Sequence, residues 1–144
     1  MKPSTIAALA LLVLTGCIAA PAAAEEGKPA DYPRVVDLLR TDSTVLGQPL
    51  PQSGGPMQVT SMIVTMEPGE ETGRHMHPVP TYGYILEGEV TIAYEGHGER
   101  VYKAGDAFME AVHVWHNGRA TGAGPTRILA VFVGADGIPN VIRP

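Results

Sequence analysis

Short apolar runs separated by turn sequences fill this chain from residue 58 to residue 133. The strand-like runs cover residues 58–66, 82–94, 101–102 and 127–133. The turns and loops between them lie at residues 68–69, 95–98, 104–106 and 121–125. The longest run bends at Gly88, so it reads as two strands. Many short strands with regularly spaced turns, and no helix longer than two turns, predict an all-β sandwich or barrel.

Two segments allow more than one local structure. Residues 32–41 fit a strand and a short helical turn equally well, because their apolar residues match both periods. Residues 108–114 read as a strand or as a loop. We therefore divide the chain into a leader of residues 1–24, a linker with a first strand at 25–56, and one domain at 57–144.

The leader has the composition of a secretory signal peptide. Lys2 supplies the positive start, and residues 6–14 form an uninterrupted apolar run. This run is shorter than the about 20 residues that a membrane-spanning helix needs. Two cleavage sites compete: an A-x-A sequence at residues 22–24, and a lipobox-like sequence ending at Cys17, where a lipid would be attached. Both predict a periplasmic protein, and the second also predicts a membrane anchor.

Charge and cysteine content exclude some alternatives. The formal net charge is −5, with 10 basic and 15 acidic residues and no basic cluster. Nucleic acids and anionic lipid surfaces are bound by clustered Lys and Arg, so neither is an expected partner. Cys17 is the only cysteine, which rules out a disulfide within the exported chain. A small-molecule ligand or substrate remains the expected partner.

Three of the five histidines have the spacing of metal ligands. His75 and His77 are two residues apart, so on a strand both imidazoles would point to the same face. His116 would add a third imidazole from a distant strand. Imidazole nitrogen binds Zn, Fe, Cu, Ni and Mn ions. The three histidines therefore predict half of a metal coordination shell.

The first of these histidine segments resembles a motif of the cupin superfamily. That motif has H-x-H, three or four residues, a glutamate, six residues and a glycine. In this chain His75 and His77 are followed after three residues by Thr81, and after six more by Gly88. The spacing is kept, and a threonine stands at the glutamate position.

The second segment resembles the second cupin motif. That motif has a glycine, five residues, a proline, x-G, two residues, a histidine and, after three more, an asparagine. This chain has Gly105, then Ala111 and His113 at the proline and glycine positions. His116 occupies the histidine position, and Ala120 stands where the asparagine would fall.

The resemblance extends over residues 59–133 and makes residues 57–144 a cupin domain. It implies a double-sheet jelly-roll barrel with a metal ion in its mouth. The implied ligands are His75, His77 and His116, and Thr81 replaces the usual glutamate ligand. Cysteine dioxygenases are cupins that use three histidines without that glutamate. The expected cofactor is a divalent ion, which could be Fe, Mn, Ni, Cu or Zn.

Other polar residues near the motifs have two interpretations each. Glu110 is six positions before His116 and shares its strand parity, so it could face the cavity. His113 could line the mouth as an acid or base, or lie on the outer rim. Glu70 and Glu71 precede the first motif and fit a solvated loop. Glu110 and His113 are thus the candidate acid–base residues.

Three classes of function are compatible with these features. The first is a metal-dependent enzyme, dioxygenase-like or isomerase- or lyase-like, acting on a small oxygen-rich molecule. The second is a non-catalytic module that binds a metal or small ligand in the cell envelope. The third is an assembly role, with a homodimer formed through the apolar strand at residues 128–133. The sequence predicts an exported cupin with a three-histidine site, and leaves catalysis open.

Overall fold

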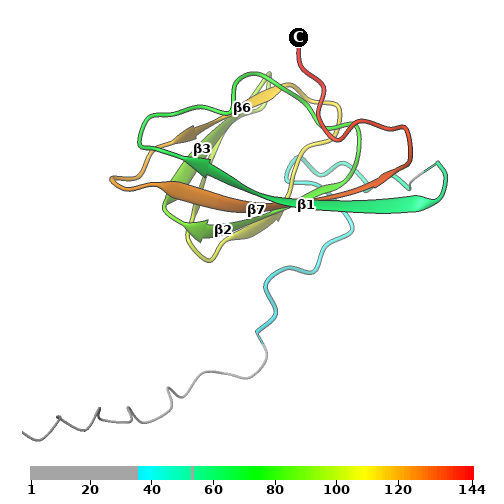
Figure 1. The fold of residues 1–144 in the computed structure, drawn as a ribbon, viewed down its shortest axis with the longest axis horizontal. Coiled ribbons are helices and arrows are strands. Elements are labelled where there is room, and N and C mark those ends of the chain that lie inside the picture. Colours follow the sequence, from blue (N-terminus) through cyan, green and yellow to red (C-terminus); the bar gives the residue numbers. More distant parts are fainter. Residues whose placement is uncertain (1–35, 53) are drawn as a thin grey trace, which may run out of the picture. The chain divides into compact units, whose positions relative to one another are not determined.

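The computed structural model describes residues 36–52 and 54–144 (Figure 1). The signal peptide predicted for residues 1–24, its two cleavage sites and Cys17 lie outside the described residues, and so does the linker up to residue 35. No helix in the described part has the length and apolar character that crossing a membrane requires.

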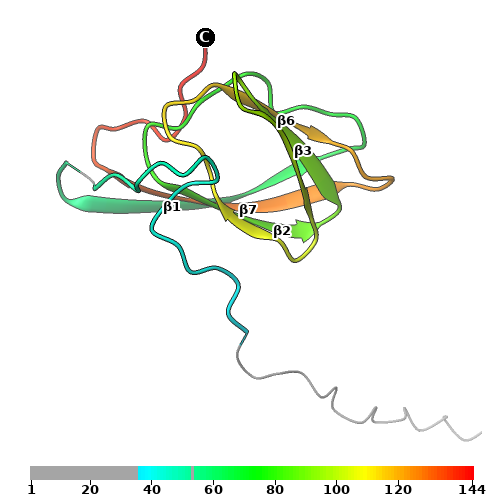
Figure 2. The same ribbon diagram turned by 180° about the vertical axis from the view of Figure 1, so that it is seen from behind.

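Two antiparallel sheets form the described fold. The strands are β1 (Met57–Met66), β2 (Thr81–Glu87), β3 (Glu89–Tyr94), β4 (Gly98–Lys103), β5 (Ala107–Met109), β6 (His116–Ala120) and β7 (Thr126–Ala135). One sheet has the order β1-β7-β2-β5 and the other the order β4-β3-β6. Figures 1 and 2 show them from opposite sides, with β3 and β6 in a layer facing β7 and β2. This arrangement confirms the predicted all-β jelly roll.

Apolar side chains fill part of the space between the sheets. Successive strand residues point to opposite faces, so every second residue of β2, β3 and β7 is buried. Ile85 and Val90 are completely buried, at 0% exposure. The main cluster also contains Met66, Ile92, Tyr94, Phe108, Ala111, Ala120 and Ile128. Burial of this shared apolar surface holds the two sheets together.

The sequence placed His116 on a distant strand but did not predict the extent of β6. Its five residues, HNGRA, include Asn and Gly, which are depleted in strands. It nevertheless pairs with β3 in a continuous antiparallel register, from Tyr94 opposite His116 to Val90 opposite Ala120. Hydrogen bonding to a neighbouring strand here outweighs local preference. This strand matters because it begins with one of the candidate ligands.

The segment before β1 differs from its prediction. Residues 36–41, the described part of the expected strand or helical turn, are exposed and have no regular structure. The described residues up to 52 contain only a single bridge, between Ser43 and Pro49. Gln48 then clamps a distant segment: its Oε1 accepts from the Val112 N–H at 3.0 Å, and its Nε2 donates to the Val112 carbonyl at 2.7 Å. This loop therefore supports the backbone beside the histidines.

The apolar strand at residues 128–133 is an interior strand. It lies within β7, which is paired with β1 along one edge and β2 along the other. It has no free edge for a partner subunit. The outer edge of this sheet is β1, where Met57, Val59 and Ile63 are 70%, 57% and 52% exposed. A homodimer stays a prediction, and β7 is not the strand edge that could form it.

The bend between β2 and β3 should depend on Gly88. Its φ is 77°, and a Cβ atom there would lie 2.8 Å from Thr126 Cα, next to the Pro125 carbonyl. We expect Gly88→Ala to lower the free energy of unfolding by roughly 3 kcal/mol or more, because a steric clash adds to left-handed strain. Urea denaturation monitored by circular dichroism measures this loss.

Gly96→Ala is the matched control for that substitution. Gly96 has a φ of 76°, but no atom lies within 4 Å of the added Cβ. The free energy of unfolding of Gly96→Ala should therefore fall only by the cost of left-handed backbone strain, about 1–2 kcal/mol. Equal losses at the two positions would show that the packing at Gly88 contributes nothing.

Candidate metal centre

The first two candidate ligands lie on a segment that pairs with three others. His75 exchanges backbone hydrogen bonds with His116, at 2.9 and 2.8 Å. Met76 pairs with Ile142, and His77 forms a parallel bridge with Val112. The segment is thus not part of a regular ladder, but its residues still alternate in direction. His75 and His77 are 8% and 6% exposed, while Met76 is half-buried.

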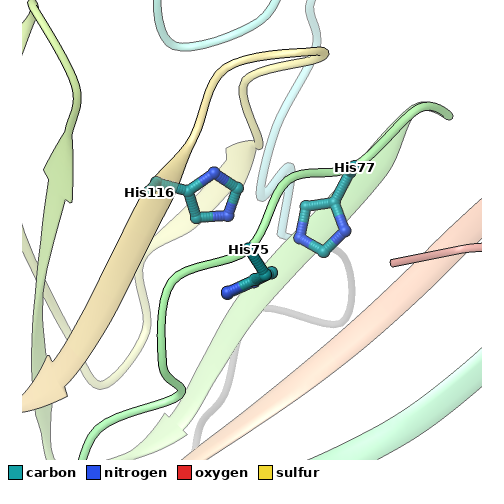
Figure 3. Close-up of side chains that lie close together, drawn as sticks. All are labelled: His75, His77 and His116. Atoms are coloured by element: carbon teal, nitrogen blue, oxygen red, sulfur yellow. The ribbon is translucent and has the colours of Figure 1, made fainter. Parts of the chain in front are cut away.

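Three imidazole rings converge at this point (Figure 3). His75 and His77 come from the connection between β1 and β2, and His116 is the first residue of β6. The ring centroids are 4.4 to 5.0 Å apart. One nitrogen from each ring lies within 4.8 Å of the others. The structure therefore brings together the three histidines that the sequence singled out.

Backbone carbonyls fix the orientation of all three rings. The Nδ1 contacts are His75 to Gly73 O at 2.8 Å, His77 to Asn140 O at 2.9 Å and His116 to Val114 O at 2.9 Å. A carbonyl oxygen only accepts, so each Nδ1 carries the proton and donates it. Each Nε2 then keeps its lone pair. Metal-binding histidines use this arrangement, in which one ring nitrogen donates to the protein and the other is free to bind the metal.

Burial keeps these rings neutral. It lowers the pKa of His77 to about 3, opposed by the Asn140 carbonyl. Burial likewise lowers the pKa of His75 and of His116. Within the described part of the chain, the buried Nε2 of His116 has no hydrogen-bond partner. A buried lone pair without a partner is costly, so this atom calls for a ligand.

The three nitrogens fit a divalent ion once the rings close around it. Donors bound at about 2.1 Å to a tetrahedral ion lie about 3.4 Å apart. The observed separations of up to 4.8 Å therefore require the most distant nitrogens to approach by about 1.4 Å. The donor set of three neutral imidazoles suits Zn, Fe, Cu and Ni.

Thr81 lies beside this centre without offering a charge. It is buried in β2, and its hydroxyl donates to the Val79 carbonyl at 3.0 Å. Its proton is therefore turned toward the backbone. The position where cupins usually carry a glutamate here contributes a neutral oxygen only.

Glu110 faces the cavity, as its strand parity allowed. The residue is 4% exposed, and Oε1 accepts from the Ala111 N–H at 2.8 Å. Its Oε2 lies 3.9 Å from Nε2 of His116. Burial raises the pKa of Glu110, and the nearby Tyr94 hydroxyl and the hydrogen bond from the Ala111 N–H oppose that rise. A carboxylate is thus present at the centre, although not at the expected position.

His113 lies outside the centre. It is exposed, does not line the cavity, and its backbone N–H donates to the His77 carbonyl at 2.9 Å. Its φ is 57°, a left-handed conformation that glycine adopts readily. This explains why the corresponding motif position carries glycine. Of the two interpretations of His113, the structure favours the outer rim over a role in the mouth.

The centre opens into a cavity of about 490 Å³. Its walls are largely apolar and include Val90, Ile92, Phe108, Ile128 and Phe132. Glu70, Glu71 and Arg143 lie along its lining. Glu70 and Glu71 are exposed, as expected for a solvated loop, yet they also border this cavity.

Two contributions to the site were missed in the sequence. Arg143 reaches the cavity and donates from Nη1 to the Thr72 carbonyl at 3.0 Å. The Asn140 carbonyl holds His77. Both belong to a C-terminal segment outside the two motifs, so no motif spacing could find them. The pairing of Met76 with Ile142 is what brings this segment to the site.

A charged contact on the outside supports the histidine segment. Arg74 donates to both oxygens of Glu95, at 2.6 and 3.0 Å, and its guanidinium lies 4.1 Å from the centre of the Trp115 ring. Arg74 and Trp115 each precede a histidine ligand candidate. The contact therefore links the two backbone segments on the side opposite the imidazoles.

A family model described as "Cupin domain" matches residues 62–132. This range includes all three converging histidines, Thr81 and Glu110. Among curated proteins, none matches the chain.

Several solved structures share the fold. A formate complex of oxalate decarboxylase from Lactobacillus farciminis is 22% identical, with a TM-score of 0.51 over 58% of this chain and 26% of that one. The DMSP lyase DddQ from Ruegeria pomeroyi DSS-3 is 24% identical, with a TM-score of 0.51 over 67% and 46%. A structure concerned with proton-coupled electron transfer in oxalate decarboxylase is 26% identical, with a TM-score of 0.52 over 58% and 23%. The chain thus spans less than half of each of these proteins.

The depressed pKa of His77 predicts acid sensitivity of the metal-free protein. The folded value of about 3 lies below the ordinary 6.5, so the unfolded chain binds more protons between these values. The contribution of His77 to the free energy of unfolding is therefore fully present above pH 6.5, and it is lost as the pH drops toward 3. Between pH 7 and pH 4.5, His77 should account for a loss of about 2–3 kcal/mol.

Urea denaturation of the metal-free protein at both pH values tests this contribution. His77→Asn removes the titrating ring but keeps an N–H donor for the Asn140 carbonyl. The loss between the two pH values should be smaller in the variant by the stated amount. The same pH dependence in both proteins would contradict the assignment.

Proposed function

Because this chain belongs to the cupin superfamily, we propose that it is a metal-dependent enzyme acting on a small, anionic, oxygen-rich molecule. His75, His77 and His116 would hold a divalent ion, Fe, Mn, Ni, Cu or Zn. One observation carries the proposal: three backbone carbonyls hold the Nδ1 protons, so three Nε2 lone pairs converge on one cavity. The reaction class we propose is dioxygenase-like or isomerase- or lyase-like.

The protein groups have separable tasks in this proposal. The histidines bind the ion, which when bound would supply Lewis-acid polarisation of a substrate oxygen. The apolar walls exclude water and strengthen electrostatic interactions inside the cavity. Arg143 places a positive charge where a carboxylate group could be paired. Glu110 is the carboxylate close enough to His116 to act at the same centre.

Charge supports an anionic substrate. Three neutral imidazoles do not offset the charge of a divalent ion, and Arg143 adds to it. The two exposed acidic residues at the cavity are engaged by neighbours: Glu70 accepts from the Glu67 N–H at 2.8 Å, and Glu71 accepts from Nδ2 of Asn117 at 2.8 Å. The similarity to an oxalate decarboxylase at 26% identity supports a small carboxylate as the first substrate class to test.

A non-catalytic binding module in the cell envelope is the alternative. The neutral Thr81 at the usual glutamate position favours it, and so does the exclusion of His113 from the cavity. Glu110 is then the one acid–base candidate that the described structure leaves inside. Turnover of a bound carboxylate would separate the enzyme from the binding module.

We also propose that the protein is exported. The support is the composition of residues 1–24, which is typical of a secretory signal peptide. The lipobox-like sequence at Cys17 leaves two exported forms open, a lipid-anchored protein and a soluble periplasmic protein. A homodimer is compatible with the exposed apolar side chains of β1 at the sheet edge. A nucleic-acid partner is not part of the proposal, because the chain is acidic.

Metal content is the first test of the proposed site. The protein should be purified without a histidine tag or chelator from metal-replete cells, and analysed by mass spectrometry of the elements. We expect close to one equivalent of a divalent ion in the wild type. His77→Ala should hold less than about a tenth of that amount, because it removes one of three donors.

His97→Ala is the matched control, since His97 is exposed in the hairpin between β3 and β4. It should keep the full metal content. A wild type that stays empty after reconstitution, or a His77→Ala protein that binds as well as the wild type, would refute the three-histidine site.

Arg143 should contribute to anion binding by the metal-loaded protein. Oxalate is the probe, and calorimetry measures its dissociation constant. We expect Arg143→Gln to raise that constant by roughly 3- to 10-fold, because a partly exposed charge pair is worth about 1 kcal/mol. Arg100→Gln, an exposed change on β4, is the control and should have no effect. Identical binding by both variants would remove Arg143 from the substrate site.

A further inference from the structure

The cavity holds a buried carboxylate with one oxygen facing the histidines. Oε1 of Glu110 is engaged by the Ala111 N–H at 2.8 Å. Oε2 lies 3.9 Å from Nε2 of His116, and both side chains are almost completely buried. A carboxylate in such a place needs a positive or proton-donating partner, since burying it alone is costly.

Glu110 stands directly opposite the position of the missing glutamate. Strands β2 and β5 pair with Tyr82 opposite Met109. Continuing that register by one residue sets Thr81 opposite Glu110, and the Glu110 N–H indeed donates to the Thr81 carbonyl at 2.7 Å. Residues directly opposite each other on antiparallel strands have their side chains on the same face, about 5 Å apart at Cβ. The carboxylate is therefore displaced by one strand and still faces the centre.

The contact between Glu110 and His116 joins two acceptors. Nδ1 of His116 donates to the Val114 carbonyl, which leaves Nε2 with a lone pair. Nε2 has no hydrogen-bond partner in the described structure. A lone pair and a carboxylate oxygen facing each other across a buried space repel unless a proton or a metal cation lies between them. Since His75 and His77 direct their own lone pairs at the same space, a metal ion satisfies all four groups together.

We propose that Glu110 is the fourth protein ligand of this metal centre, supplied by the residue after β5 in place of the glutamate that cupins carry at position 81. The inference rests on the proposed three-histidine site. Donors at about 2.1 Å from a tetrahedral ion are about 3.4 Å apart. The observed 3.9 Å between Oε2 and Nε2 therefore needs a movement of about half an ångström. That movement is no larger than the closure required of the rings.

The fourth ligand changes what the centre offers to a substrate. One carboxylate lowers the net charge of a bound divalent ion and its ligands from +2 to +1. It adds a hard oxygen donor to three imidazoles, which improves the match to Fe and Mn relative to Cu. Open positions remain for substrate on the cavity side, because tetrahedral coordination can expand.

Cobalt(II) binding by the full domain tests the assignment, with Glu110→Gln as the variant. Glutamine keeps an oxygen for the Ala111 N–H but removes the charge. We expect the dissociation constant for Co(II) to rise by at least the roughly 10- to 100-fold that loss of an outer partner costs. The visible absorption bands of bound Co(II) should shift as an anionic oxygen donor is lost. Glu71→Gln, a change of another cavity carboxylate, is the matched control and should alter neither quantity.

The outcomes separate this inference from the proposed function. If Co(II) binds the wild type and His77→Ala equally, or binds neither, the three-histidine site itself fails. If binding requires His77 but Glu110→Gln has the wild-type constant and spectrum, the fourth-ligand assignment alone is overturned. Unchanged binding with lost turnover would likewise overturn it, making Glu110 a proton carrier. If Glu110→Gln does not fold, Glu110→Asp replaces it, and wild-type binding by that shortened side chain would also overturn the assignment.

Discussion

The centre depends on three hydrogen bonds from imidazole nitrogens to backbone carbonyls. The acceptors, at Gly73, Val114 and Asn140, belong to three segments that are far apart in the sequence. Each carbonyl selects the tautomer and the orientation of one ring, so the folded backbone prepares the lone pairs before any ion arrives. The C-terminal segment is therefore a part of the site, because it supplies the carbonyl that holds His77 and is itself held by Met76 pairing with Ile142.

The strand pattern and the glycine turns were readable from the sequence because they are local. Alternation and turn residues predicted β1, β2, β3 and β7 closely. The extent of β6 beyond His116 was missed, since its Asn, Gly and Arg have no strand preference and only pairing with β3 makes these residues extended. The opposite happened at residues 36–41. Their apolar residues predict a strand or a short helical turn, but no neighbouring strand pairs with them and they have no regular structure.

The site was predictable to the extent that it follows motif spacing. The histidines were found by spacing, and their convergence is observed. His113 and Glu110 show the limit of such reasoning. At position 113, the motif glycine reflects a left-handed backbone conformation, which His113 also adopts, and it indicates no chemical role. At Glu110, parity gave the correct face, but the cross-strand register with Thr81 is a tertiary fact that spacing within one segment does not contain.

The proposed placement of the anionic ligand at Glu110 instead of position 81 is compatible with the fold, because Thr81 and Glu110 are cross-strand neighbours on one inner face. Moving a carboxylate between directly opposite positions shifts it by about 5 Å, a distance that a glutamate side chain can span. Thr81 then fills the vacated position, and its hydroxyl finds a partner in the Val79 carbonyl. The glutamate gains the Ala111 N–H, so one oxygen is fixed and the other is free to face His116. A jelly roll can thus keep its strand framework and its three histidines while the origin of the anionic donor changes.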